Sequence, residues 1–256
     1  MNKYSRKHVF DTDGNLLPIE QRTFTTNEGY ELVLINGGTT EGSVIYQIDE
    51  HIYEGKLYQI KKGSIKNPFH PRLSGVGYCG IGPYPITTIQ GKSKEYKIWC
   101  GMLARAYDEE QRSKYPTYKD VTVHPDWHNY QTFAKWVNTT SNYQLGWQLD
   151  KDLLAGSSKI YSPSTCIFIP PQLNKFMTNI KSTNTSGYPG VRWHKRDLVW
   201  EAQIKSVITD KIMYLGRFST AEEADIAYKT VRVEQCLVWV NRMQGILPQA
   251  ALDGIH

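Results

Sequence analysis

The sequence has few cysteines, and none of them falls in a pattern that binds metal or builds a disulfide framework. Its four cysteines, Cys79, Cys100, Cys166 and Cys236, are scattered, with no CxxC pair and no histidine at ligand spacing. This spacing argues against a zinc knuckle and against a disulfide scaffold. Free thiols are typical of a reducing compartment.

Long apolar runs are also missing. No stretch of about 18 apolar residues is available to span a bilayer, and the polar start Met1 to Lys7 lacks the apolar segment of a secretory signal. We therefore expect a cytoplasmic protein, inside the host cell if a phage encodes it, with no membrane partner.

What the chain does contain is enough sequence for two or three small modules, because 256 residues exceed the usual length of one domain. The composition, 40% hydrophobic and 21% charged, is that of an ordinary soluble protein. The net charge of +5 makes nucleic acid a plausible partner without requiring one. The distribution of that charge matters more than its sum.

The N-terminal region, residues 1–88, predicts a β-rich module, either a small SH3-like antiparallel barrel or a sheet. Short β-rich segments alternate there with turn signals. The three strand predictions are residues 30–35, 43–48 and 56–60. Two roles are open for this module. Either it contacts phosphates through Lys61, Lys62 and Lys66, or it only packs against other parts of the protein or acts as a spacer between them.

The central region, residues 89–180, predicts helices over 93–107 and 129–136, where apolar positions recur with helical spacing. Residues 148–175 follow with the pattern strand, loop, strand, helix, and Pro170-Pro171 opens the last helix. The predicted fold class of the whole chain is therefore α+β.

A polar linker over 181–186 precedes the C-terminal module, residues 187–245. Strand signals occur at 190–193, 199–207 and 211–217. The spacing from Ser219 to Glu222 is that of a helix capping box. We expect a three-stranded sheet with one helix packed on it.

The residues of this module carry a resemblance. Gly190-Val191-Arg192-Trp193, Trp200 and the run Tyr214-Leu215-Gly216-Arg217-Phe218 keep the order and spacing of a known pattern. The module resembles the AP2 DNA-binding domain. That resemblance implies a three-stranded sheet set into the major groove of double-stranded DNA, with the helix behind it.

Charge supports the same interpretation. The segment from residue 181 to residue 217 contains seven basic and three acidic residues, so it carries +4 of the chain's net charge of +5. Cationic side chains on a sheet contact phosphates, and Arg192 and Arg196 can pair with guanine edges. The predicted DNA-contacting residues are Arg192, Trp193, His194, Lys195, Arg196, Trp200, Gln203, Lys205 and Arg217. The alternative is an ordinary solvated face on which Trp193 and Trp200 only pack.

The central segment from Leu149-Asp150-Lys151-Asp152 to Asn174 resembles the HNH, or ββα-metal, endonucleases of phages and mobile elements. The resemblance implies that Asp150 and Asn174 hold one divalent ion. Together with Asp152 they form an oxygen-rich set, which suits Mg²⁺ or Mn²⁺.

The segment departs from that family at two positions. Lys151 stands where the family has the histidine that activates water, and Thr165 stands where a structural asparagine is usual. Three hypotheses follow: burial lowers the pKa of Lys151, or His124 or His128 supplies the base, or the module is a remnant kept for DNA binding. Alternatively, Asp150 and Asp152 are turn residues and Asn174 is a surface position on a helix.

The sequence thus predicts a homing-endonuclease-like protein in which the C-terminal sheet finds a site and the central module nicks or cuts the DNA. One metal per active site favours nicking, or a homodimer for a double-strand cut. The rival hypotheses are a non-catalytic DNA-binding regulator with a degenerate HNH site, and a structural role with protein partners.

Overall fold

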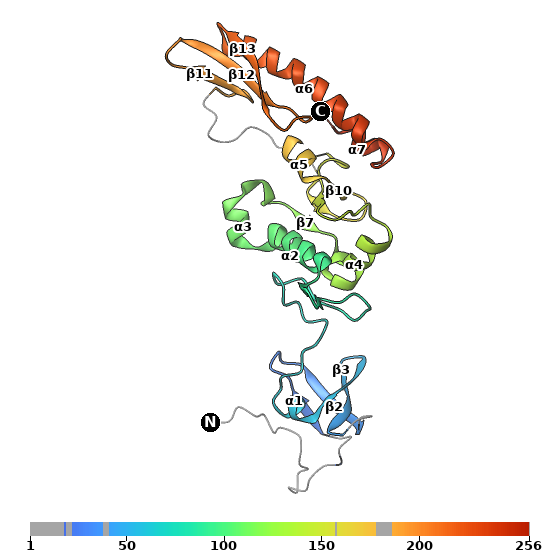
Figure 1. Cartoon of the computed structure of the whole chain (residues 1–256). Helices are drawn as coiled ribbons and strands as arrows, with labels where there is room; N and C mark the ends of the chain where they lie inside the picture. The colour runs from blue at the N-terminus through green and yellow to red at the C-terminus, as the bar shows by residue number, and fades with distance from the viewer. Residues whose placement is uncertain (1–17, 19–21, 38–40, 157, 178–185, 256) are drawn as a thin grey trace. The chain divides into compact units, whose positions relative to one another are not determined.

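The computed structural model describes residues 18, 22–37, 41–156, 158–177 and 186–255 (Figure 1). The predicted polar start of the chain and residues 181–185 of the predicted linker lie outside these ranges. The chain forms two compact units, one running to Ile86 with His128–Gln131 added, the other comprising Thr87–Trp127 and Thr132–His256. Within the described ranges, no helix is both long and apolar enough to cross a bilayer.

The first unit contains a four-stranded antiparallel meander. Its strands are β1 (Thr23–Thr25), β2 (Glu31–Gly37), β3 (Ser43–Ile48) and β4 (His51–Lys56), paired in the order β1-β2-β3-β4. Successive strand residues point to opposite faces, so Leu32 and Leu34 are buried together with Val44, Tyr46 and Ile48. The predicted sheet is confirmed. In the described residues β1 and β4 are not paired, so it is an open sheet.

The prediction of a strand over 56–60 is wrong, because helix α1 (Leu57–Lys61) follows β4 directly. Leu57 and Ile60 are three residues apart, and one helical turn brings both to the same side. Ile60 is buried in the core of the sheet and Leu57 packs against that core. A strand would have placed these two side chains on opposite faces.

The second unit begins with the hairpin of β5 (Thr87–Thr88) and β6 (Gly91–Lys92). The predicted helix over 93–107 is confirmed as α2 (Lys94–Tyr107), whose N-cap Ser93 accepts a hydrogen bond from the backbone of Tyr96. Trp99, Met102 and Leu103 form its buried stripe. The elements that follow are α3 (Glu109–Lys114), the 3₁₀ turns η2 (Pro116–Tyr118) and η3 (Pro125–His128), β7 (Thr122–Val123) and α4 (Tyr130–Thr139).

The predicted order of strand, loop, strand and helix is confirmed between residues 148 and 177. β8 (Gln148–Asp150) pairs antiparallel with β10 (Ile167–Ile169), and α5 (Pro171–Met177) begins at the second proline of Pro170-Pro171. The loop between the strands also holds β9 (Ile160–Tyr161), which pairs in parallel with β7.

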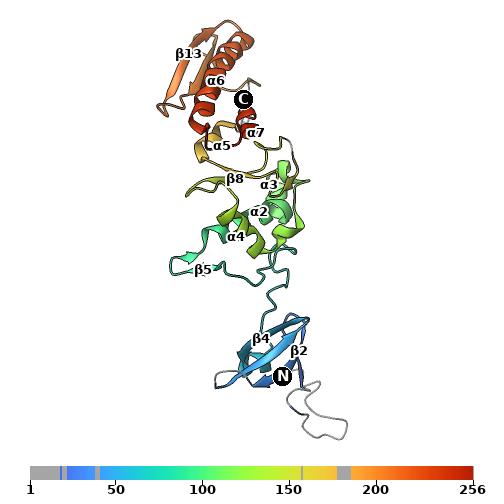
Figure 2. The same cartoon turned by 90° about the vertical axis from the view of Figure 1, so that its right-hand side faces the viewer.

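The C-terminal part folds as a three-stranded antiparallel sheet with a long helix across one face (Figure 1 and Figure 2). Its elements are β11 (Val191–His194), β12 (Val199–Lys205), β13 (Ile212–Phe218), α6 (Ala221–Met243) and α7 (Gln249–Asp253). The small residues Ala202, Ala221 and Ala224 let helix and sheet approach closely, and Val191 completes this core.

The capping box lies one residue later than predicted. The segment Ser219-Thr220-Ala221-Glu222-Glu223 offers the required spacing twice, from Ser219 to Glu222 and from Thr220 to Glu223. The backbone is extended at Thr220, whose side chain accepts a hydrogen bond from Glu223 N, while the Glu223 carboxylate accepts one from Thr220 N. Both orphan donors are thereby satisfied.

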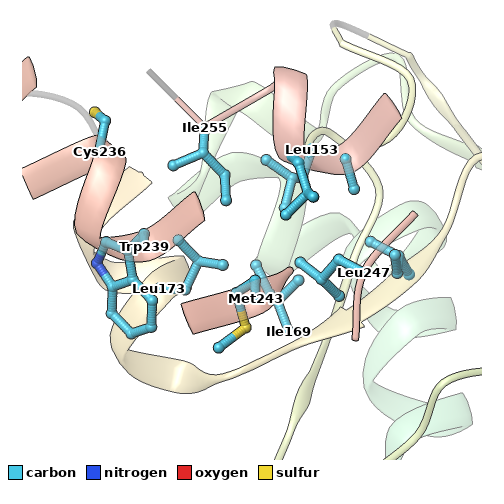
Figure 3. Packing of buried hydrophobic residues seen from close by; sticks show 11 residues of the cluster. Leu153, Ile169, Leu173, Cys236, Trp239, Met243, Leu247 and Ile255 are labelled. Atoms are coloured by element: carbon cyan, nitrogen blue, oxygen red, sulfur yellow. The ribbon is translucent and has the colours of Figure 1, made fainter. Parts of the chain in front are cut away.

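Helix α6 continues well past the sheet, and its second half builds a different core. Trp239 and Met243 pack with Leu153 and Leu173 of the predicted nuclease segment (Figure 3). The whole cluster of buried residues is Leu153, Ile167, Ile169, Leu173, Cys236, Trp239, Met243, Leu247, Ala251, Leu252 and Ile255. The predicted central and C-terminal modules therefore share a core and, apart from His128–Gln131, fall into one compact unit.

Candidate nucleic-acid interface

The register of the C-terminal sheet aligns three charged residues in one row across its strands. Arg192 of β11 lies opposite Glu201 of β12, and Glu201 lies opposite Arg217 of β13. Their sequence neighbours Val191 and Ala202 are buried against α6. Because side chains alternate along a strand, the row lies on the face that points away from the helix.

Glu201 sits beneath the two arginines of this row. Its side chain is only 5% exposed, whereas those of Arg192 and Arg217 are 59% and 49% exposed. Glu201 Oε2 accepts from Arg192 Nε at 3.0 Å and from Nη2 at 2.8 Å, and Oε1 accepts from Arg217 Nε at 3.3 Å. Burial by itself would raise the pKa of the Glu201 carboxyl. The hydrogen bond from Arg192 and the positive charges of the neighbouring His194, Arg192 and Arg217 together outweigh burial, so the pKa lies below its ordinary range.

A second carboxylate, that of Asp197 in the turn after β11, contacts three side chains of the same region. It accepts from Arg196 Nε at 2.7 Å, lies 2.7 Å from Arg217 Nη1 and lies 3.5 Å from His194 Nδ1. The hydrogen bond from Arg196 and the charge of Arg217 hold the pKa of Asp197 below its ordinary range, against a smaller opposing effect of burial. Arg217 is thus held by two carboxylates.

The other polar residues predicted to contact DNA are not hydrogen-bonded to Glu201 or Asp197 in the part of the chain that the structure describes. Lys195 is exposed in the turn, and Lys205 at the end of β12 is exposed with Nζ 2.5 Å from Asp210 Oδ1. Gln203 follows Glu201 by two residues on β12, so the two side chains lie on the same face of the sheet. Gln203 lies opposite Tyr214 of β13. The structure therefore brings the predicted arginines together, while the lysines lie toward the ends of the sheet.

Trp193 and Trp200 lie opposite each other in the register, on the other face from Arg192 and Glu201. Their ring centroids are 5.1 Å apart. Trp200 packs against the core formed with α6, which matches the packing alternative, while Trp193 keeps 40% of its surface exposed.

Sequence reasoning missed Glu201, Asp197 and Tyr214. The two carboxylates counted only as negative charge in the sequence, although they fix the arginines. Tyr214 is 55% exposed, and its proximity to Arg217 contributes to a raised pKa of that guanidinium. Only the strand register places these groups beside the arginines.

In the central segment, Asp150 caps a turn. Its Oδ1 accepts from the backbone N–H of Asp152 at 2.9 Å and of Leu153 at 2.7 Å. Burial raises the pKa of the Asp150 carboxyl, and these two backbone hydrogen bonds offset part of the rise. The carboxylate therefore has a structural role that the turn alternative anticipated.

The other predicted members of the metal set are engaged elsewhere. Lys151 is buried, and its Nζ donates to Asp152 Oδ1 at 2.5 Å and to the carbonyl of Ser158 at 3.0 Å. Asn174 Nδ2 donates to Gln148 Oε1 at 2.8 Å. Among the residues that the structure describes, no three histidine, cysteine or acidic side chains are grouped so that they could hold a metal ion. Asn174, one of the three expected ligands, is thus hydrogen-bonded to another side chain.

Of the two candidate histidines, His124 has an acidic partner other than Asp150. His124 follows β7 and contacts Asp126, with 3.7 Å between Nδ1 and Oδ2. His128 is the last residue of η3. Thr165, at the position of the family's asparagine, fixes its own loop by donating to the carbonyl of Ile160 and accepting from Ser162 N.

Asp150 and Asp152 nevertheless border a cavity of about 440 Å³, which Asp253 before the C-terminus also lines. The remaining lining residues are mostly apolar or small: Leu153, Leu154, Gly156, Ile169, Met177, Ala250 and Gly254. Asn174 is not among them. The cavity thus joins the predicted nuclease segment to the end of the chain.

Comparison with known proteins gives one relevant similarity. Over 53 residues the chain is 43% identical to an AP2-like ethylene-responsive transcription factor from Arabidopsis thaliana. The similarity covers 21% of this chain and 15% of the plant protein. No protein-family model and no solved structure matches the chain. The similarity supports the AP2-like resemblance, and nothing in the comparisons points to an HNH enzyme or a phage.

Proposed function

We propose that the chain binds double-stranded DNA through the helix-free face of the β11–β13 sheet. The observation that carries the proposal is the exposed row of Arg192 and Arg217, fixed by Glu201 on the central strand. Guanidinium groups are the preferred donors to guanine edges and phosphates. The partial similarity to an AP2-like transcription factor supports the same partner.

The test is selection of bound duplexes from a randomised DNA library, followed by measurement of affinity against salt concentration. We expect an enriched sequence and a logarithm of affinity that falls linearly with the logarithm of salt, because phosphate contacts release counterions. Arg192→Ala should lose the sequence preference. Binding that is absent, or that is independent of salt, would remove the proposal and favour a protein-interaction role.

We propose metal-dependent phosphodiester hydrolysis as a second and separate activity of the central segment. It is supported by the β8, β10, α5 order and by the position of Asp150 at the end of β8, beside the cavity. Against it stand the engaged side chains of Lys151 and Asn174. Mg²⁺ or Mn²⁺ would supply a Lewis acid, and of the expected residues only Asp150 and Asp152 border the cavity.

The second activity is tested by incubating supercoiled plasmid that carries the selected sequence with Mg²⁺ or Mn²⁺. Nicked product that disappears with Asp150→Asn would support a nuclease, and linear product would support a pair of copies acting on both strands. A plasmid that stays supercoiled under every metal condition would leave a non-catalytic DNA-binding protein with a degenerate HNH-like segment.

A further inference from the structure

The buried carboxylate of Glu201 is unusual in a surface that should attract DNA. A carboxylate repels phosphate, and burying it beneath a cationic face reduces the positive charge of that face by one. Glu201 is nevertheless placed on the central strand, directly opposite both Arg192 and Arg217. Its position calls for a role that depends on the arginines.

The hydrogen bonds show what Glu201 does to Arg192. Both bonds from Arg192 start on one edge of the guanidinium, Nε and Nη2, and end on the same oxygen, Oε2. Among the described residues no partner is found for Nη1. The end of the fork, formed by Nη1 and the second N–H of Nη2, therefore remains available as two parallel donors.

Arg217 differs from Arg192, because its partners occupy more of the group. Nε contacts Glu201 and Nη1 contacts Asp197. One of the two nitrogens at the end of its fork, Nη1, is therefore already in contact with a carboxylate. Of the two arginines over Glu201, Arg192 is the one that presents an open fork.

We infer that Glu201 is a positioning residue that holds the Arg192 fork end-on toward the major groove, so that the sheet recognises a guanine. Two parallel N–H donors match guanine O6 and N7, the commonest specific contact of arginine with DNA. A guanidinium that is held in place loses less side-chain entropy on binding than a free one. The inference rests on the proposed DNA binding and adds which base is recognised and which residue fixes its reader.

The experiment compares Glu201→Gln with Asp197→Asn in the full-length protein. Each substitution removes one negative charge from the same face, but only the first removes the charged support of Arg192. Library selection with the wild type should yield a guanine that Arg192→Lys no longer prefers, because lysine cannot form the bidentate contact. Binding of each variant to duplexes with and without that guanine is then measured.

For Glu201→Gln we expect the preference for this guanine to fall about tenfold, as for loss of one bidentate pair. Affinity for unrelated DNA should rise, because the released Arg192 turns to phosphate, and the salt slope should steepen by about one. Asp197→Asn should raise affinity for all sequences and keep the guanine preference. Combining Glu201→Gln with Arg192→Lys should cause no loss of preference beyond that of Arg192→Lys alone, because both changes act through Arg192.

Opposite changes in specificity and in general affinity separate positioning from damage to the fold, since a misfolded sheet would lose both; circular dichroism checks the fold directly. An unchanged guanine preference in folded Glu201→Gln would overturn the inference while leaving DNA binding intact. A wild type that selects no sequence would instead refute the proposed function.

Discussion

At the scale of single residues, Glu201 and Asp197 make the C-terminal sheet sensitive to acid. Both have pKa values below the ordinary range, so their stabilising effect is present above an ordinary carboxyl pKa of about 4 and is lost as the pH falls through the lower folded values. The melting temperature of the wild type should fall more steeply below pH 4 than that of Glu201→Gln. Parallel curves from thermal melts would contradict this.

The carboxyl of Asp150 affects the pH dependence of stability in the opposite direction. Its pKa is raised by burial, so the stability linked to this carboxyl is greatest in acid and is lost as the pH rises through the folded value. Asp150→Asn keeps an acceptor for the N–H groups of Asp152 and Leu153, and at pH 7 it should melt at the same temperature as the wild type or higher. Asp150→Ala removes the acceptor and should cost about 1 kcal/mol of unfolding free energy in urea titrations. A more stable alanine variant would show that the two hydrogen bonds do not matter.

At the scale of elements, the start of α6 offers a matched pair of substitutions. Thr220→Ala removes the side-chain acceptor for Glu223 N and should lower the free energy of unfolding by about 1 kcal/mol. Ser219→Ala should have a much smaller effect, because its hydroxyl takes no part in the cap. Equal losses in urea titrations would place the N-cap elsewhere.

The second half of α6 gives a further element-scale prediction. Trp239 is 5% exposed in the core shared with α5 and β10, so Trp239→Ala should cost about 3 to 5 kcal/mol. Leu237 lies on the same helix but is 59% exposed, and Leu237→Ala should cost less than about 0.5 kcal/mol. Denaturant titration of both variants tests whether α6 is buried as described.

At the scale of the whole molecule, the predicted central module is incomplete without the end of the chain. Leu153, Ile169 and Leu173 share their core with seven buried residues between positions 236 and 255. A fragment covering residues 89–180 should therefore expose this core, and its backbone amides should exchange rapidly with solvent. A fragment covering 87–256 should retain slow exchange in β8, β10 and α5. Equal protection in both fragments would show that the shared core is dispensable.

Much of the fold could be predicted from the sequence, because periodic and local signals mark it. Apolar spacing predicted α2, the proline pair predicted the start of α5, and strand signals lie within one or two residues of β11, β12 and β13. The helix α1 was missed because a segment of five residues fits one helical turn as well as a strand. The register of the capping box was missed because two overlapping motifs had the same spacing.

The candidate interface was predictable in part. Composition and the AP2-like pattern indicated Arg192 and Arg217 and the sign of the surface charge, since these depend only on residue types and their order. The support by Glu201, the packing of Trp200 and the pairing of Lys151 with Asp152 depend on strand register and on contacts across a loop. Those were beyond any local signal.

What the sequence alone determined is therefore the order of the elements and the cationic character of the C-terminal sheet, because helical and strand periods and formal charges are local properties. Only the tertiary structure decided that the last residues of the chain complete the core around Leu173 and that one buried carboxylate holds two arginines. The shared core joins residues that are distant in sequence, and the Glu201 pairing joins residues that are neighbours only across strands. Hydrophobic burial and charge pairing depend on closeness in space and not on closeness in sequence.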